Sequence, residues 1–367
     1  MYTEETIKNH HHFFDNVITA LKLKKVKGNV VPVLHILPDA IPFVAALKKI
    51  ADIPFVIPKP KTIDYKAQDQ LVGTTIIDVV RAEIGQEQFI NRIPKTKTAF
   101  LDIGGYFAPA IPVIQDHLGS DFCGVTEDTE NGFQKYIKAG FTFPFINLAR
   151  SPLKQNEDHM VGMAIGYSIE RILREHNMLL NGLKFGVIGY GKVGRSISES
   201  MKIKQANVTV ADSDSISLTH AFSHGLNTNT NEQLLESSDV ICIATGCIAL
   251  KEEEFSRLKN GSWVFSVTSS DDALDIAWLK ENYERQEIST YVDKYIREDH
   301  YFYVVNSGNS INFIHGTTVG DFILLVQAEL LVALYRLLTE DKIGWNMEVG
   351  KKERQTICSH WLTQFSK

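Results

Sequence analysis

The chain has 367 residues, of which 44% are hydrophobic, and this is enough to build two domains with separate cores. Its formal net charge of −6 and sequence pI near 6.1 argue against a surface that binds nucleic acid or anionic membranes. The N-terminal stretch MYTEETIKNHHHFFDN lacks the basic and apolar regions of a signal peptide, and no apolar run of about 18 residues stands out, so we expect a cytoplasmic protein.

The first half of the chain alternates between helical and strand patterns. The N-terminal helix is expected to end near Leu23, with His10, His11 and His12 on a partly exposed face rather than in a metal site. The elements that follow are a strand over 29–36, a helix over 38–51, a strand over 54–57, the loop PKPKTID, and strands over 98–103, 122–125 and 144–147. Strands that alternate with helices predict a parallel sheet, whose C-terminal strand ends gather ligand groups. His35, Asp102 and the 126–132 loop lie at such ends.

The second half begins with a long helix over 158–180 that connects the domains and is closed by Asn181-Gly182. The later elements are strands over 185–188, 207–211, 239–244, 263–267 and 302–305, helices over 192–204 and 322–338, and a tail of mixed charge over 339–367. The four cysteines, Cys123, Cys242, Cys247 and Cys358, show neither zinc-ligand nor redox spacing and are expected to be reduced thiols.

The stretch LKFGVIGYGKVG carries a dinucleotide-binding fingerprint. Gly189, Gly191 and Gly194 follow a buried strand and open a helix, in G-x-G-x-x-G spacing. This arrangement permits a tight turn, a close approach of the pyrophosphate to the backbone and close packing of helix on strand. Asp212 ends the next strand, where a carboxylate takes the ribose hydroxyls, and this favours NAD over NADP. The alternative is a doubly wound domain whose glycines serve packing alone.

These patterns predict an α/β protein with two doubly wound parallel-sheet domains, in which a Rossmann NAD-binding domain is inserted in a substrate domain. Residues 1–165 are assigned to the substrate (catalytic) domain and residues 166–320 to the NAD-binding domain. Residues 321–367 form a helix and tail that return to the substrate domain or to a neighbouring subunit.

Several segments resemble the S-adenosylhomocysteine hydrolase family, in the same order and along most of the chain. They are VLHIL, FLDIGG, GVTEDTENG, PFINLARSPLKQNEDH, VIGYGKVG, VTVADSD, ATGC, VDKY and SGNSINF followed by GDF. The resemblance implies a homodimer or homotetramer that holds NAD tightly and oxidises a ribose 3′-hydroxyl group. The resulting ketone acidifies the 4′ proton, homocysteine leaves C5′, water adds, and the ketone is reduced again.

The resemblance also implies roles for individual residues. Lys154 and Asp158 fall on the lysine and aspartate that contact the ribose hydroxyls, and His35 falls on a histidine at the floor of the active site. Asp128 stands for a family glutamate, and His159 for the asparagine after the active-site aspartate. Judged without the resemblance, Lys154 and Asp158 are a solvated i, i+4 pair and His35 is a core histidine. The cofactor positions are Gly189, Gly191, Lys192, Val193, Gly194, Asp212, Thr245, Gly246 and Asn312, with Thr129 and Asn131 from the first half. No metal site is predicted.

Departures from the family concentrate in the substrate half. Ile103 replaces an aspartate, Leu37 replaces an adenine-contacting threonine, and Ser269 and Val319 replace two histidines. The tail EVGKKERQTICSHWLTQFSK has no counterpart of the family's lysine and tyrosine. Four interpretations therefore stay open: an NAD-dependent enzyme acting on another nucleoside-like or sugar-bearing small molecule, a divergent hydrolase, a catalytically silent NAD-binding regulator, and a D-2-hydroxy-acid dehydrogenase. The dehydrogenase would need an arginine and a His/Glu pair that are not in place.

Overall fold

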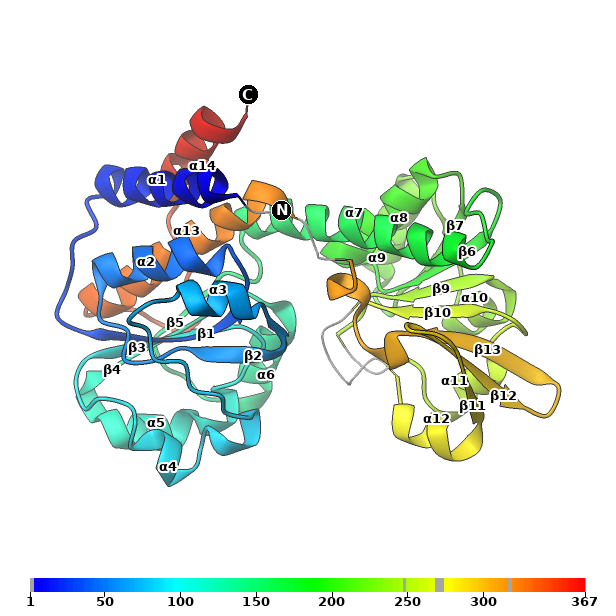
Figure 1. The fold of residues 1–367 in the computed structure, drawn as a ribbon, viewed down its shortest axis with the longest axis horizontal. Helices are drawn as coiled ribbons and strands as arrows, with labels where there is room; N and C mark the ends of the chain where they lie inside the picture. Colours follow the sequence, from blue (N-terminus) through cyan, green and yellow to red (C-terminus); the bar gives the residue numbers. More distant parts are fainter. Residues whose placement is uncertain (1–2, 247–248, 268–273, 316–318, 367) are drawn as a thin grey trace. The chain divides into compact units, whose positions relative to one another are not determined.

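The protein folds as two compact units. The computed structural model describes residues 3–246, 249–267, 274–315 and 319–366 (Figure 1). One unit comprises Met1–Glu157 and Gly320–Lys367, and the other comprises Asp158–Val319. Helix α7 (Pro152–Glu175) carries the chain from the first unit into the second, so the boundary expected at residue 165 lies inside this helix. That the first unit binds the substrate stays a prediction.

The first unit is built on a five-stranded parallel sheet. Its strands, in order across the sheet, are β2 (Ile57–Ile63), β1 (Asn29–Ile36), β3 (Thr98–Asp102), β4 (Phe122–Glu127) and β5 (Phe145–Asn147). One face is covered by α2 (Ala40–Ile50) and α13 (Ile323–Thr339), and α1 (Glu4–Ala20) and α14 (Lys351–Phe365) pack on the outside of these two helices (Figure 1). The other face is covered by α4 (Glu87–Ile90), α5 (Ile111–Leu118) and α6 (Glu130–Ala139) (Figure 1). The chain order reverses between β1 and β3, and in open parallel sheets ligands bind beside such a reversal, at the carboxyl ends of the strands.

The structure corrects two expectations about the N-terminal part of this unit. The segment PKPKTID is not a loop, because β2 extends over it as Ile57–Ile63. Its prolines are tolerated because β2 lies at the edge of the sheet, where some backbone N–H groups need no partner. His10 does not lie on an exposed face either: it is buried, and its Nε2 lies 2.7 Å from Oδ1 of Asp321.

The apolar helix α13 forms the core of the first unit. By length and composition alone, the segment Gly320–Thr339 could cross a membrane, with a mean hydropathy of 1.8, so the expectation that no such run exists is wrong. Most of the segment is buried, however, and its leucines and valines pack against the sheet and against α1 and α2. We therefore interpret it as a core helix.

The C-terminal tail forms helix α14, which the sequence did not predict. The Arg354 guanidinium on α14 donates from Nε to Oε1 of the fully buried Glu329 on α13, at 2.5 Å, and the Ser151 hydroxyl donates to the other oxygen of that carboxylate. A buried carboxylate is tolerated only when it is paired and hydrogen-bonded. These contacts fix the tail on the core of its own unit.

Arg354→Met is expected to lower the free energy of unfolding by about 3 to 5 kcal/mol, because it leaves Glu329 buried without its cation. Chemical denaturation measures this loss. The double variant Arg354→Met/Glu329→Gln should recover part of the stability, since it also removes the buried charge. A single variant as stable as the parent protein would contradict the prediction.

The second unit contains an eight-stranded sheet. Its order is β11 (Glu284–Ser289), β12 (Val292–Arg297), β13 (His300–Val305), β10 (Trp263–Ser266), β9 (Val240–Ile243), β6 (Lys184–Ile188), β7 (Asn207–Ala211) and β8 (Asn227–Thr228). Every neighbouring pair from β13 to β8 is parallel, which gives the order of a dinucleotide-binding fold. The predicted fold class is confirmed, with one addition: β11 and β12 extend the sheet as antiparallel strands.

The helices of this unit cover both faces of its sheet. Helices α7, α8 (Lys192–Ile203) and α9 (Ser215–Ser223) pack on one face, and α10 (Asn231–Ser237), α11 (Glu252–Arg257) and α12 (Ile276–Asn282) on the other. Helix α7 begins earlier and ends earlier than expected. Leu153 N–H donates to the Ser151 hydroxyl at its start, and Asn177, with a left-handed φ of 60°, ends it, so Asn181-Gly182 is not its cap.

Candidate functional site

The glycine loop between β6 and α8 is shaped for a phosphate group. Gly189 has φ of 97°, and a Cβ on Gly194 would lie 2.0 Å from the Gly189 carbonyl oxygen, so both positions require glycine. A Cβ on Gly191 would meet nothing within 4 Å. Gly191 is the N-cap of α8, and no side chain caps this end of the helix. The N–H groups of the first helical turn are therefore available to an anion.

Asp212 holds the glycine loop from the end of β7. One carboxylate oxygen accepts a hydrogen bond from Tyr190 N–H at 2.6 Å, and the other accepts from Asp214 N–H at 2.8 Å. The Arg195 side chain fixes the same loop from the helix side, because its Nε donates to the Tyr190 carbonyl at 3.1 Å. The Asp212 charge is thus set beside the loop, where a ribose would follow the phosphates.

Two further predicted cofactor segments belong to the same edge of the sheet. A Cβ on Gly189 would lie 2.8 Å from the Ala244 carbonyl oxygen and 3.1 Å from Thr245 N, so the segment with Thr245 and Gly246 abuts the glycine loop. Asn312 lies in a short 3-10 helix, Ile311–Phe313. Among the residues that the structure describes, no hydrogen-bond partner reaches its buried Oδ1. An orphaned buried amide oxygen of this kind fits a ligand donor such as a carboxamide.

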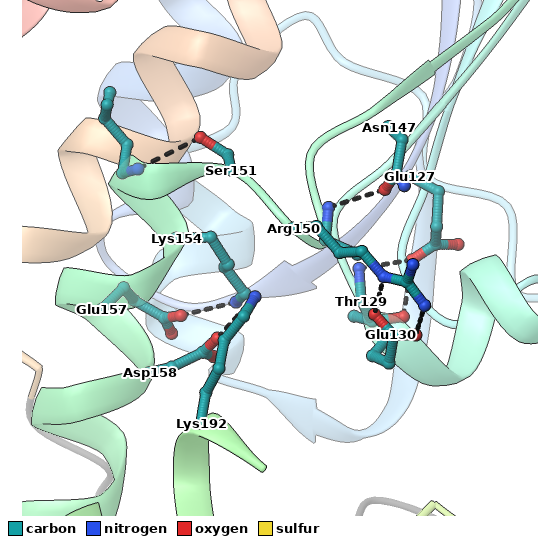
Figure 2. Close-up of polar contacts among 12 residues, drawn as sticks. Glu127, Thr129, Glu130, Asn147, Arg150, Ser151, Lys154, Glu157, Asp158 and Lys192 are labelled. Carbon is teal, nitrogen blue, oxygen red and sulfur yellow. Dashed lines mark hydrogen bonds and ion pairs between the residues drawn. The ribbon is translucent and has the colours of Figure 1, made fainter. Parts of the chain in front are cut away.

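The structure separates the roles of the residues around the start of α8. Lys192 directs its ammonium toward Asp158, with 3.5 Å between Nζ and Oδ2 (Figure 2). Val193 packs against the apolar core beside α7. His159 is half-exposed, its Nδ1 lies 3.9 Å from a Glu199 carboxylate oxygen, and its carbonyl accepts a hydrogen bond from the Ser196 hydroxyl.

In the first unit, His35 stands near the end of β1. The Thr62 hydroxyl donates to the Lys59 carbonyl at 3.1 Å, so it receives the Nδ1 proton of His35 across 2.7 Å. The Nε2 atom is then the acceptor nitrogen of a neutral ring. Burial, together with the cations Lys59 and Lys154, lowers the pKa of His35 well below its usual value. His35 is therefore a neutral acceptor at pH 7.

Lys154 lies in the first turn of α7, where it forms an ion pair with Glu157. Its Nζ lies 2.5 Å from Oε2 of Glu157, and the two side chains are only 13% and 9% exposed (Figure 2). The solvated-pair interpretation of Lys154 is therefore wrong. Lys154 is close enough to His35 for its charge to lower the pKa of the imidazole. Glu157 was not singled out from the sequence, although its position three residues after Lys154 is a helical ion-pair spacing.

The loops after β3 and β4 are joined by the buried carboxylate of Glu127. It accepts hydrogen bonds from the N–H groups of Gly104 and Gly105. It also accepts from the N–H group of Thr129 and, at 2.6 Å, from the Thr129 hydroxyl (Figure 2). Burial, followed by the charges of Asp102 and Asp128, raises the pKa of Glu127 well above its usual value. Thr129 also caps α6, because its hydroxyl accepts from Gly132 N–H.

The other predicted residues of this unit divide between binding positions and the core. Asp128 is buried beside Glu127, and Asn131 is half-buried in the first turn of α6. Asp102 accepts the N–H groups of Tyr106 and Phe107 and the Tyr136 hydroxyl, so it organises the loop that follows β3. The replaced positions Ile103 and Leu37 are buried and half-buried, and Ser269 lies outside the described residues.

The two units thus define a dinucleotide-binding α/β protein with a second parallel sheet whose strand ends carry polar groups. Residues 165–318 match the family model described as S-adenosyl-L-homocysteine hydrolase, NAD binding domain. The second unit is therefore similar to the NAD-binding domain of that family, and NAD is its cofactor. The free backbone donors at the start of α8, together with Asp212 and the orphaned Asn312 oxygen, fit this group.

Solved structures with similar architecture come from three bacteria. A dipicolinate synthase chain from Bacillus halodurans is 13% identical, with a TM-score of 0.46, over 84% of this chain and 98% of that one. The corresponding dipicolinate synthase chain from Bacillus subtilis is 14% identical, with a TM-score of 0.47, over 85% of this chain and 98% of that one. Phosphoglycerate oxidoreductase from Vibrio cholerae is 12% identical, with a TM-score of 0.46, over 70% of this chain and 81% of that one. Likenesses with TM-scores below 0.5 carry no conclusion about this chain.

Asp212→Ala is expected to weaken NAD binding by about 10-fold or more, because it removes the loop contact to Tyr190 N–H and the ribose partner. It should also reduce the preference for NAD over NADP, whose 2′-phosphate would meet the Asp212 charge. Calorimetry with both dinucleotides measures the two effects. A parent protein that prefers NADP would refute the role of Asp212.

Proposed function

We propose that the protein is an NAD-dependent enzyme that oxidises a ribose-type hydroxyl group, on a nucleoside or sugar-bearing substrate other than S-adenosylhomocysteine. The observation that carries the proposal is the nearly buried pair of Lys154 and Glu157, whose lysine charge also acts on His35. An amine that served solubility alone would be exposed. The cytoplasmic location and the homo-oligomeric state belong to the same proposal.

In the proposed reaction, the Lys154 ammonium first passes a proton to Glu157, and the resulting amine accepts the proton of the substrate hydroxyl group. Glu157 holds the side chain in place and stabilises the ammonium that forms. Asp158, four residues further along α7, orients a neighbouring hydroxyl group. His35 receives a substrate hydrogen bond at Nε2, because Nδ1 is committed to Thr62. Bound NAD supplies the hydride acceptor.

The proposal is tested with the purified full-length protein. Mass spectrometry of small molecules released on denaturation should show NAD together with any substrate that copurifies. Addition of the substrate to the native protein should give absorbance near 340 nm from bound NADH. The competing proposal of a silent NAD-binding regulator expects NAD alone and no absorbance change with any nucleoside or sugar.

Hydrolysis of S-adenosylhomocysteine is expected to be very slow or absent, with NAD binding intact. Ile103 and Leu37 offer no polar partner to adenosine. Each adenosine group left without a hydrogen bond costs roughly 1 to 3 kcal/mol of binding free energy. Two such losses weaken binding by roughly 30-fold to 10⁴-fold. Ser269 and Val319 also lack the imidazoles of the family. A thiol assay for released homocysteine measures this hydrolysis. Turnover of about 1 s⁻¹ would identify a divergent hydrolase instead.

A further inference from the structure

Lys59 is a buried cation in the first unit that the proposed chemistry does not use. It lies in β2, where the register with β1 shifts between Leu34 and Ile36. Such irregularities redirect side chains. Its side chain is 9% exposed, and burial lowers the pKa of its ammonium. Within the described ranges, no hydrogen bond or ion pair ends on this ammonium.

The ammonium of Lys59 points to the turn that follows β3. A Cβ built on Gly104 would lie 3.5 Å from Lys59 Nζ and 3.9 Å from Arg81 Nη2. Arg81 Nη2 and Lys135 Nζ each donate to the Gly104 carbonyl, at 3.0 and 3.1 Å. Gly104 has φ of 101°, which L-amino acids with side chains rarely adopt. The cationic groups of Lys59, Arg81 and Lys135 therefore lie around the turn at Gly104, where no side chain fills the space between them.

Two of the three carboxylates near Lys59 are already engaged by other donors. Glu127, Asp128 and Asp102 are close enough to raise the pKa of Lys59 against the effect of burial. The Glu127 oxygens, however, are engaged by the N–H groups of Gly104 and Gly105, and the Asp102 oxygens by Tyr106, Phe107 and Tyr136. Burial removes much of the hydration of the Lys59 ammonium, and an anionic ligand group would compensate for that loss.

We propose that Lys59 and Arg81, at the Gly104 turn, form a subsite for an anionic group of the substrate, either a carboxylate or a phosphate. The subsite lies at the carboxyl ends of β1 and β3, where the chain order of the sheet reverses. It deepens the proposed function and rests on it: the oxidised substrate is an acidic or phosphorylated sugar or nucleoside. Lys59 attracts the anion as a point charge, and the Arg81 fork directs it.

The subsite is tested by calorimetric titration of the NAD-loaded, full-length protein with inorganic phosphate and, separately, with malonate. At least one anion should bind, and Lys59→Met should weaken its binding by about 10- to 100-fold. Lys59→Arg should retain most of the affinity. Lys66→Met is the matched control, because Lys66 is an exposed lysine of the same unit, and it should change nothing. The tighter of the two anions identifies the substituent.

A second measurement needs no charge-removing variant. In protein whose lysines carry ¹³C-methyl groups, the Lys59 resonance, assigned by its loss in Lys59→Arg, should titrate at higher pH when the anion is present. The proposal is overturned if neither anion binds, or if Lys59→Met and Lys66→Met bind it equally. Neither experiment measures NADH. If the protein does not oxidise a hydroxyl group, the anion-binding result therefore remains valid. If a neutral sugar reduces bound NAD and no anion binds, the anion subsite is refuted and the proposed oxidation is not.

Discussion

Lys154→Ala is expected to leave NAD bound and to lower the rate of NADH formation by about 10²- to 10⁴-fold, the usual contribution of a positioned acid or base. The structure supports this expectation because the Lys154 amine is only 13% exposed and is held by Glu157 rather than solvated. Rapid mixing of the NAD-loaded protein with substrate, followed near 340 nm, measures the rate.

Two further variants separate chemistry from folding in that experiment. Glu157→Gln keeps the shape of the partner but removes its charge, so it should shift the pH profile of NADH formation as well as its rate. Lys138→Ala, an exposed lysine on α6, should behave as the parent protein does. If Lys154→Ala reduces its cofactor at the parent rate, Lys154 is not the base.

The glycine loop predicts a contrast between two substitutions. Gly191→Ala should fold with a stability within about 0.5 kcal/mol of the parent protein, because its Cβ would enter open space at φ of −70°. It should nevertheless weaken NAD binding by at least about 10-fold, since the new methyl group occupies the approach of the pyrophosphate.

Gly194→Ala should instead destabilise the fold by about 1 to 3 kcal/mol, because its Cβ would press on the Gly189 carbonyl. Thermal unfolding of the cofactor-free proteins and calorimetry with NAD distinguish the two effects. Equal NAD affinity in Gly191→Ala and the parent protein would mean that the loop serves packing alone.

Local patterns in the sequence were sufficient for most regular elements. β1 and β7 were predicted with their observed ends, because each is a short apolar run bounded by polar or glycine residues. The cofactor loop was predictable for the same reason: strand, glycines, helix and Asp212 are close in sequence, and each has a local conformational cause. Segments without such local signals were missed, including β11, β12 and α14.

The resemblance of the sequence to a hydrolase family directed attention to Lys154, Asp158 and His35, but their environments depend on distant parts of the chain. Whether Lys154 is solvated depends on Glu157 and on the packing at the start of α7. The tautomer of His35 depends on Thr62, in a strand that the sequence pattern placed in a loop. The prolines and alternating lysines of β2 are not typical of a strand. They are tolerated because β2 lies at the edge of its sheet, and strand propensities do not distinguish edge strands from central ones.

The α/β class, the dinucleotide loop and the acidic residue beside it follow from the amino-acid sequence, since they depend on neighbours within about 20 residues. Which charged side chains contact one another depends on the tertiary fold. It brought Lys59 and Arg81 to the Gly104 turn from separate segments, and it buried Glu329 between Ser151 and Arg354. Burial changes the free energy of a charge far more than local sequence does, so the role of a lysine or a carboxylate is fixed by packing between distant segments.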